Sequence, residues 1–406
     1  MSNADILNNV ETNTPVEKNT EDKKFQRHTQ RIMKGNFAAA EAAKLCRVNF
    51  IPAYPITPQT TIVEELSNKV AKKELDATYV NMDSEHSVFA AAMGASIAGD
   101  RVFTATSGQG LFYAHEVLHA IAHFRLPIVI CNVGRPSIPW NIWSDQTDSL
   151  AQRDTGWVQF YGESSQEVLD SVIQAYIISE TLDLPVMVVL DAFYQSHTSE
   201  NIWVPDQDLV DEFLPPRKLK GSEIDVDHPK AIGGLVPPEH YETFNYRYWS
   251  DALKVENMVN ETGRKFGKHF GRDYSAVETV NIGPQTEMIL VSISSITTTI
   301  RGIIKSHPEI GLLKLRLVKP FPEKSVIEAL KDVRKDVKIV NIERNFLGGK
   351  EGAIQQEMKR ALYGKDLHMY DVYTGLGGKD VPPITIEKII YAMKHDPDPV
   401  TWIDML

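Results

Sequence analysis

The chain is poor in cysteine and has no long hydrophobic run. Its 406 residues include two cysteines, Cys46 and Cys131, and no CxxC pair, which argues against an iron–sulfur cluster or a structural zinc held by this chain. Each cysteine lies in an apolar segment, so we expect a buried thiol in a reducing compartment. Apolar runs such as residues 126–133 and 184–190 are far too short to span a bilayer. No membrane association is predicted.

Basic clusters are also missing. The net charge is −11, from 43 Lys and Arg against 54 Asp and Glu, which argues against binding to nucleic acid or to an anionic membrane. Residues 1–30 are polar and lack the apolar core of a signal peptide. We therefore expect residues 1–30 to form a flexible tail and the protein to be cytoplasmic.

The remainder is ordinary globular sequence, with 42% hydrophobic and 24% charged residues. Residues 31–203 alternate helical and strand patterns, which predicts a parallel sheet covered on both faces. Residues 204–280 are rich in proline among aromatic and charged residues, and we interpret them as an extended connection with a surface role. Residues 281–406 again alternate strand and helical patterns, which predicts a second, smaller α/β domain.

The stretch AYPITPQT, residues 53–60, places Thr57 between Pro55 and Pro58 where a strand ends and a helix begins. Proline restricts its own φ and biases the preceding residue toward extended geometry, so this turn is rigid. It is either a tight strand-to-helix connection or part of a ligand site, because ligands bind at the carboxyl ends of strands in open α/β sheets.

Glu85 lies in MDSEHS, residues 82–87, at the start of a small-residue helix that continues as VFAAAMGASIAG. A carboxylate in the first turn favours the helix dipole, so a purely structural role is available. The apolar sequel also indicates a buried helix end, where a carboxylate favours sharing a proton with a ligand. Both interpretations stay open on these residues alone, and His86 is more typical of a structural residue.

Further along, TATSGQG (residues 104–110) follows a strand and opens a helix, so Gly108 and Gly110 allow a ligand to approach. Arg135 ends a buried strand, where its guanidinium either covers the sheet edge or binds a carboxylate. The loop WSDQTDSLAQRDTGW that follows is a solvated connection or a wall of an active site. The glycine-rich segments 343–354 and 374–380 are turns or phosphate sites.

These motifs, in this order, resemble the α subunit of the 2-oxoacid:ferredoxin oxidoreductases, and the pyruvate enzymes most. The resemblance extends from Gly35 to the C-terminus. It implies an α/β fold in which residues 31–203 are the pyrimidine-side domain of a thiamine-diphosphate enzyme (a parallel sheet flanked by helices). Residues 281–406 would then be a transketolase C-terminal-like α/β domain, joined by the connection 204–280.

The resemblance also implies the chemistry and the partners. Thiamine diphosphate would be shared with a β subunit, with Mg²⁺ and iron–sulfur clusters on partner chains. Glu85 matches the residue that hydrogen-bonds the aminopyrimidine ring, and Tyr54 and Pro55 would lie against the cofactor. Thr57 matches a substrate contact, and Arg135 matches the arginine that binds the substrate carboxylate. With β, γ and δ subunits, the complex would convert pyruvate and CoA to acetyl-CoA and CO₂ while reducing ferredoxin, or run the reverse reaction.

Several alternatives stay open at this point. Within the family, 2-oxoisovalerate, 2-oxoglutarate and oxalate carry the same 2-oxocarboxylate group as pyruvate. A β-type subunit of a 2-oxoacid dehydrogenase complex or a transketolase relative would keep the thiamine cofactor and change the acceptor. A non-catalytic α/β scaffold subunit would fit the acidic surface and the long connection.

Overall fold

The computed structural model of the chain describes residues 27–220, 224–229 and 231–405. Residues 1–26, most of the predicted tail, lie outside the described residues. Strand β1 (His28–Lys34) begins inside the predicted tail, which therefore extends three residues too far. The reason is backbone pairing: β1 runs antiparallel to β8 (Ser199–Pro205), with His28 opposite Pro205.

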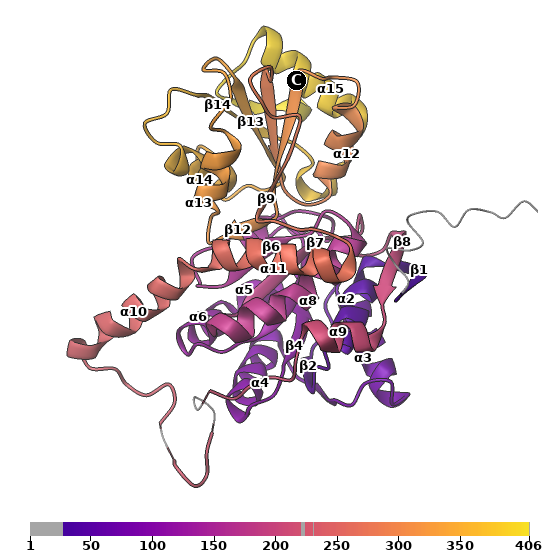
Figure 1. The fold of residues 1–406 in the computed structure, drawn as a ribbon, viewed down its shortest axis with the longest axis vertical. Coiled ribbons are helices and arrows are strands. Elements are labelled where there is room, and N and C mark those ends of the chain that lie inside the picture. Colours follow the sequence, from indigo (N-terminus) through magenta and orange to yellow (C-terminus); the bar gives the residue numbers. More distant parts are fainter. Residues whose placement is uncertain (1–26, 221–223, 230, 406) are drawn as a thin grey trace, which may run out of the picture.

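The N-terminal half, coloured indigo to magenta in Figure 1, is built on a five-stranded sheet. The strand order in this sheet is β12-β6-β7-β5-β4. Strands β4 to β7 are mutually parallel, and every residue of β5 and β7 is buried, as expected for a sheet covered on both faces. A separate parallel pair, β2 and β3, is joined to the sheet by a bridge between Phe50 and Val102. The strands are β2 (Phe50–Ala53), β3 (Thr78–Asn81), β4 (Phe103–Thr106), β5 (Val129–Gly134), β6 (Val158–Tyr161) and β7 (Val186–Asp191).

Helices cover both faces of this sheet, as predicted. Side chains alternate along each strand, so Cys131 and Val188 pack in the core that α2 and α8 cover. Ile130 and Val189 pack on the other side, in the core beneath α4 and α6. The helices are α2 (Gly35–Leu45), α3 (Thr60–Ala71), α4 (Glu85–Ala98), α5 (Gln109–Tyr113), α6 (His115–His123), α7 (Thr147–Leu150) and α8 (Ser165–Leu182).

The C-terminal half contains a six-stranded sheet in the order β15-β14-β13-β10-β11-β9, in which only β9 is antiparallel to its neighbour. One strand of this half, β12 (Leu317–Lys319), leaves it and pairs antiparallel with β6 of the first sheet. The other strands are β9 (Val277–Val280), β10 (Met288–Ser292), β11 (Ile310–Leu315), β13 (Lys338–Glu343), β14 (His368–Tyr373) and β15 (Val400–Trp402). The helices are α12 (Ile296–Ile303), α13 (Glu323–Ala329), α14 (Ala353–Ala361) and α15 (Pro383–His395), with short 3₁₀ turns at Leu376–Gly378 and Ile403–Met405.

The segment predicted as an extended connection, residues 204–280, contains three helices among its described residues. They are α9 (Gln207–Phe213), α10 (Pro238–Ala252) and α11 (Val255–Phe270). The predicted surface role does not hold for α11, which packs against α8. Its buried side chains recur at helical spacing and join the N-terminal core: Val255, Val259, Phe266 and Phe270.

The structure also describes the two cysteines and the length of the apolar helices. Cys46 and Cys131 are both free and fully buried, and burial raises the pKa of each thiol. Across the described ranges, no helix combines the length and apolar character that crossing a bilayer requires.

Candidate active site

The rigid turn after β2 is held from two sides. Gln59 is fully buried, and its side-chain amide donates hydrogen bonds to the carbonyls of Tyr54 (2.8 Å) and Ala105 (3.0 Å). Asn36 of α2 donates to the carbonyl of Pro58 at 2.8 Å. The peptide bond before Pro58 is cis. The turn is therefore tied to the carboxyl end of β4, where a ligand would lie in an open α/β sheet.

Arg135 follows the last residue of β5 and reaches the same turn. Its guanidinium donates to the Thr57 carbonyl from Nη1 and to the Gln109 side chain from Nη2, while Nε has no partner among the described residues. Gly108 makes this path possible, since a Cβ at that position would lie 2.1 Å from Arg135 Nε. Burial lowers the pKa of Arg135, and the negative charges of Asp148 and Glu85 oppose that shift.

Asp148 in α7 is the buried acceptor at the centre of the site. Its Oδ2 accepts hydrogen bonds from the backbone N–H groups of Gly108 (2.8 Å) and Arg135 (3.2 Å) and from the Asn132 side chain (3.0 Å). Its Oδ1 accepts from the N–H of Ser149 at 2.6 Å. Burial raises the pKa of Asp148 to about 6, although these donors oppose the shift. The Asp148 carboxylate thus holds the backbone at both Gly108 and Arg135.

Glu85 is the first residue of α4, and Ser84 caps that helix by accepting a hydrogen bond from the N–H of Ser87 at 3.2 Å. Its carboxylate rests on Gly110: a Cβ there would lie 2.6 Å from Glu85 Oε1 and 2.7 Å from Thr106 Oγ1. The Thr106 hydroxyl is buried and has no partner in the described part of the chain. Burial of Glu85 was predicted, but the described residues of the chain bury it only partly.

The structure brings the three predicted catalytic residues to one edge of the sheet. Arg135 contacts Thr57 directly, and Glu85 is close enough for its charge to act on Arg135. The predicted cofactor contacts lie in the same turn, with Tyr54 half-buried and Pro55 exposed. Gln59, Gln109 and Asp148 are parts of the site that the sequence analysis did not single out, although all three fall inside motifs that it noted.

A polar junction connects this edge to the C-terminal half. Asp191, at the end of β7, accepts hydrogen bonds from the Arg344 guanidinium (3.1 Å) and the N–H of Ser295 (3.1 Å). Asp145 accepts from the N–H of Gly377 at 3.1 Å. The predicted glycine-rich turn at residues 374–380 therefore supports the loop that carries Asp148.

The chain can now be compared with known proteins. A profile described as pyruvate flavodoxin/ferredoxin oxidoreductase, thiamine diphosphate-binding, matches residues 41–264, and one described as pyruvate:ferredoxin oxidoreductase core domain II matches residues 286–386. The first match alone covers more than half of the chain. The chain belongs to the pyruvate:ferredoxin oxidoreductase family.

Curated relatives cover nearly the whole chain. Ketoisovalerate oxidoreductase subunit VorA of Pyrococcus horikoshii is 41% identical over 90% of this chain and 94% of its own length. Pyruvate synthase subunit PorA of Methanothermobacter thermautotrophicus is also 41% identical, over 92% of this chain and 98% of its own. Both relatives are named as subunits, so this oxidoreductase chain belongs to a multi-subunit enzyme that acts on 2-oxoacids with ferredoxin as acceptor.

A solved structure shares the fold. The 2-oxoglutarate:ferredoxin oxidoreductase from Magnetococcus marinus, with 2-oxoglutarate, coenzyme A and succinyl-CoA bound, matches with a TM-score of 0.68 and 17% identity. The match covers 89% of this chain and 65% of that chain. Together with the family match, this confirms the predicted fold class of an α/β thiamine-diphosphate-binding domain followed by a second α/β domain.

Proposed function

We propose that this chain is the α subunit of a thiamine-diphosphate-dependent 2-oxoacid:ferredoxin oxidoreductase. The complex converts pyruvate and CoA to acetyl-CoA and CO₂ with reduction of ferredoxin, or catalyses the reverse synthesis of pyruvate. The observation that carries the proposal is the convergence of Glu85, Thr57 and Arg135 at the carboxyl edge of one parallel sheet. The family match supplies the reaction class.

The residues around Glu85 fit an aminopyrimidine ring. A half-buried carboxylate lies beside the unpartnered Thr106 hydroxyl, and Gly110 leaves room for both because it has no side chain. When bound, thiamine diphosphate supplies the nucleophilic carbon and the electron sink for decarboxylation. Glu85 would then hold a proton at a ring nitrogen, and Tyr54 and Pro55 would be the residues of the rigid turn that contact the cofactor.

Arg135 is suited to the carboxylate that all 2-oxoacids share. A guanidinium has five N–H donors, and the hydrogen bonds to Thr57 and Gln109 occupy two of them. The remaining donors can bind a carboxylate, and Asp148 holds the backbone of Arg135 in place. The turn held by Gln59 would keep Thr57 in a fixed place beside the substrate, and precise placement is a large part of catalysis.

The site is half of a complete cofactor site, and partner chains supply the rest. A β subunit holds the diphosphate with Mg²⁺, while partner chains of γ and δ type carry iron–sulfur clusters and pass electrons to ferredoxin. The subunit names of the relatives support an assembly of this kind. We place the complex in the cytoplasm.

The substrate is tested on the assembled complex. The chain is equally similar to a ketoisovalerate and a pyruvate subunit, at 41% identity to each, so a panel of pyruvate, 2-oxoisovalerate, 2-oxoglutarate and oxalate is required. We expect CoA-dependent viologen or ferredoxin reduction with pyruvate. NAD⁺ reduction through lipoamide would indicate a 2-oxoacid dehydrogenase instead, and no turnover with any 2-oxoacid would favour a scaffold subunit.

A further inference from the structure

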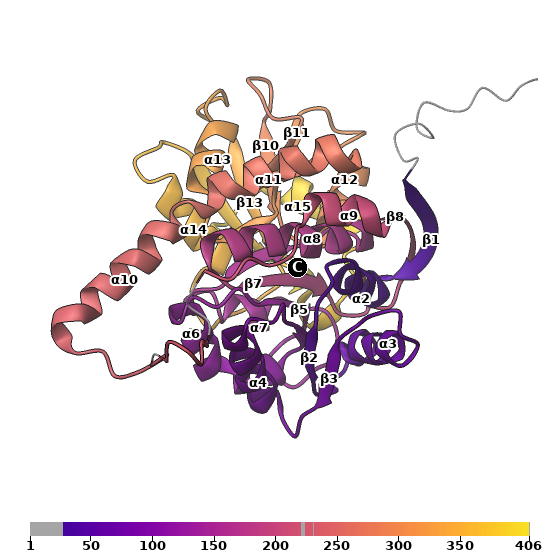
Figure 2. The ribbon, with the colours of Figure 1, turned by 60° about the horizontal axis from the view of Figure 1, so that its bottom comes forward.

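Helix α10 is a long helix that the described residues of its own chain contact only near its C-terminal base. None of its 15 residues is buried, whereas six residues of the next helix, α11, are buried. In Figures 1 and 2 alike, α10 extends away from the body of the molecule while α11 lies along it. We call residues 235–253 the arm. An isolated helix of this length is marginal in water unless packing stabilises it, so the arm needs a partner.

The arm exposes large apolar side chains. Six of them have exposed fractions between 53% and 99%: Leu235, Tyr241, Phe244, Tyr246, Trp249 and Leu253. The four aromatic side chains among them present on the order of 500 Å² of surface. Aromatic residues are enriched where proteins contact one another, and exposed patches of this size mark interaction sites.

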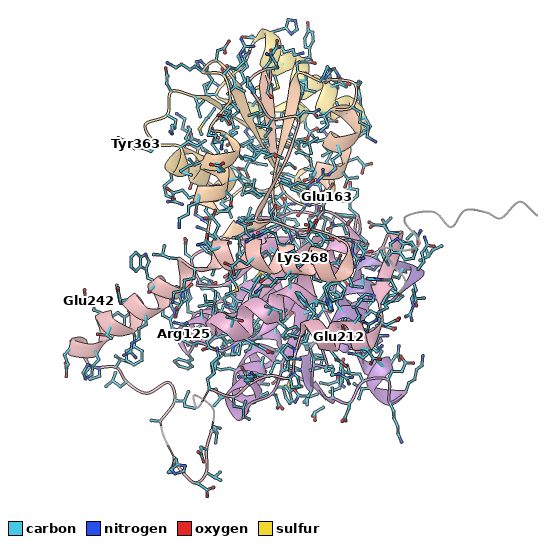
Figure 3. All side chains as sticks on the ribbon, viewed as in Figure 1. Arg125, Glu163, Glu212, Glu242, Lys268 and Tyr363 are labelled. Carbon is cyan, nitrogen blue, oxygen red and sulfur yellow. The ribbon has the colours of Figure 1, made fainter. Side chains whose placement is uncertain are left out.

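The base of the arm is fixed to the body. The Tyr248 hydroxyl donates to the carbonyl of Gly156 at 2.7 Å, and its ring stacks on His123 with the centroids 5.3 Å apart. Asp251 pairs with Arg125 at 2.6 Å. Figure 3 shows Arg125 near this base and Glu242 at the protruding part of α10. The aromatic side chains are therefore held at a defined place.

A second surface, on α4, is only partly covered by the described residues. Helix α4 begins at Glu85 and is apolar nearly all round, yet Met93 and Ile97 are only partly buried, and no atom of the described residues lies within 4 Å of a Cβ built at Gly94. The backbone N–H of Ile224, in the segment that precedes the arm, donates to the Ile97 carbonyl at 2.9 Å. This contact covers the C-terminal end of α4, and the stretch between Glu85 and the contact, which includes Met93 and Gly94, is the open side of α4.

We propose that the arm and the open side of α4 are one docking surface for the partner chain that completes the site at Glu85. The inference rests on the proposed function. A stable interface needs roughly 800 Å² on each partner, more than the four aromatic side chains of the arm present, so we assign both surfaces to one partner. A second copy of this chain would bring another pyrimidine-side half and would leave Glu85 without the missing half.

Site-specific photo-crosslinking on the co-expressed complex identifies the occupant. A benzophenone amino acid replaces Tyr246 in the arm or, as a control, Tyr363, which is 92% exposed in the C-terminal half (Figure 3). We expect the arm probe to crosslink the partner chain that binds thiamine diphosphate, and the control probe not to do so. A crosslink to a second copy of this chain, to a different subunit, or to no chain would overturn the proposal.

A matched set of variants tests the affinity. Tyr241→Ser, Phe244→Ser and Trp249→Ser combined should weaken association with that partner about ten- to hundredfold, because buried aromatic anchors dominate interfaces, whereas Tyr363→Ser should not. The thermal midpoint of the separate chain should stay unchanged, since these side chains are exposed; unchanged affinity would refute the proposal. Neither measurement depends on turnover, so a complex that crosslinks as expected but is inactive with every 2-oxoacid would refute only the proposed function.

Discussion

Gly110→Ala separates the geometry of the site from the stability of the chain. Gly110 is in helix α5, and a Cβ there would lie 2.6 Å from both Cγ and Oε1 of Glu85 and 2.7 Å from Thr106 Oγ1. Ordinary contacts between such atoms are about 3.5 Å, so the Glu85 carboxylate must shift by about 1 Å. Because the end of a glutamate side chain moves easily, we expect the substitution to displace the carboxylate and leave the fold intact.

The expected magnitude follows from the displacement. A misplacement of about 1 Å in an active site can lower the rate roughly 100-fold, which corresponds to about 2.7 kcal/mol of lost transition-state stabilisation. Stability should hardly fall, because alanine is better than glycine in a helix by up to about 1 kcal/mol. The assay is viologen reduction by the assembled complex with saturating CoA, measured as kcat/KM for pyruvate beside the thermal midpoint.

Gly302→Ala is the matched control, since Gly302 lies in α12 and none of the residues that the structure describes comes within 4 Å of a Cβ built there. It should keep the wild-type rate and gain slightly in stability. A Gly110→Ala complex with the wild-type kcat/KM would refute the placement of Glu85 in the site. A large fall in thermal midpoint would refute the expectation that the carboxylate moves at little cost.

Further predictions concern Arg135 and Asp148. Arg135→Lys cannot keep both hydrogen bonds to Thr57 and Gln109, and losing one charge-assisted bond costs about 1.5–3 kcal/mol. We therefore expect kcat/KM to fall about ten- to hundredfold for pyruvate and 2-oxoisovalerate alike. A loss confined to one substrate would place Arg135 at the substrate side chain. Burial raises the pKa of Asp148 to about 6, so the folded chain retains a proton there that the unfolded chain releases near pH 4. Stability should therefore fall by up to about 3 kcal/mol between pH 4 and 7 relative to Asp148→Asn, and parallel pH profiles from denaturant titrations would contradict this.

Local patterns were sufficient to predict the parallel sheet and most of its elements, because apolar strands and amphipathic helices carry their own periodicity. The break at Ala114 between α5 and α6 was not predicted, since no glycine or proline marks it. The pairing of β12 with β6 joins residues about 160 positions apart and depends on how the two halves pack. Neither strand carries a local sequence pattern that predicts which strand it pairs with.

The residues of the candidate site also fall into those that the sequence could predict and those that it could not. Glu85, Thr57 and Arg135 could be proposed from residue type, position at element ends and family resemblance. Asp148 could not, because its role depends on burial and on N–H groups that Gly108 and Arg135 bring from other segments. The sequence shows an acidic residue in a polar loop, and only the folded chain shows that this carboxylate is an internal acceptor.

The central claim is that this chain supplies the catalytic carboxylate of a shared thiamine-diphosphate site, and Glu85→Gln tests it most directly. Glutamine keeps the size of the side chain but cannot exchange a proton with the cofactor ring, and loss of general acid–base function costs about 10²- to 10⁴-fold in rate. In the assembled complex, we predict such a loss in the pyruvate-dependent single-turnover rate with the subunit composition unchanged. A Glu85→Gln complex that turns over at the wild-type rate would contradict the account and leave Glu85 as the first residue of α4 with a structural role.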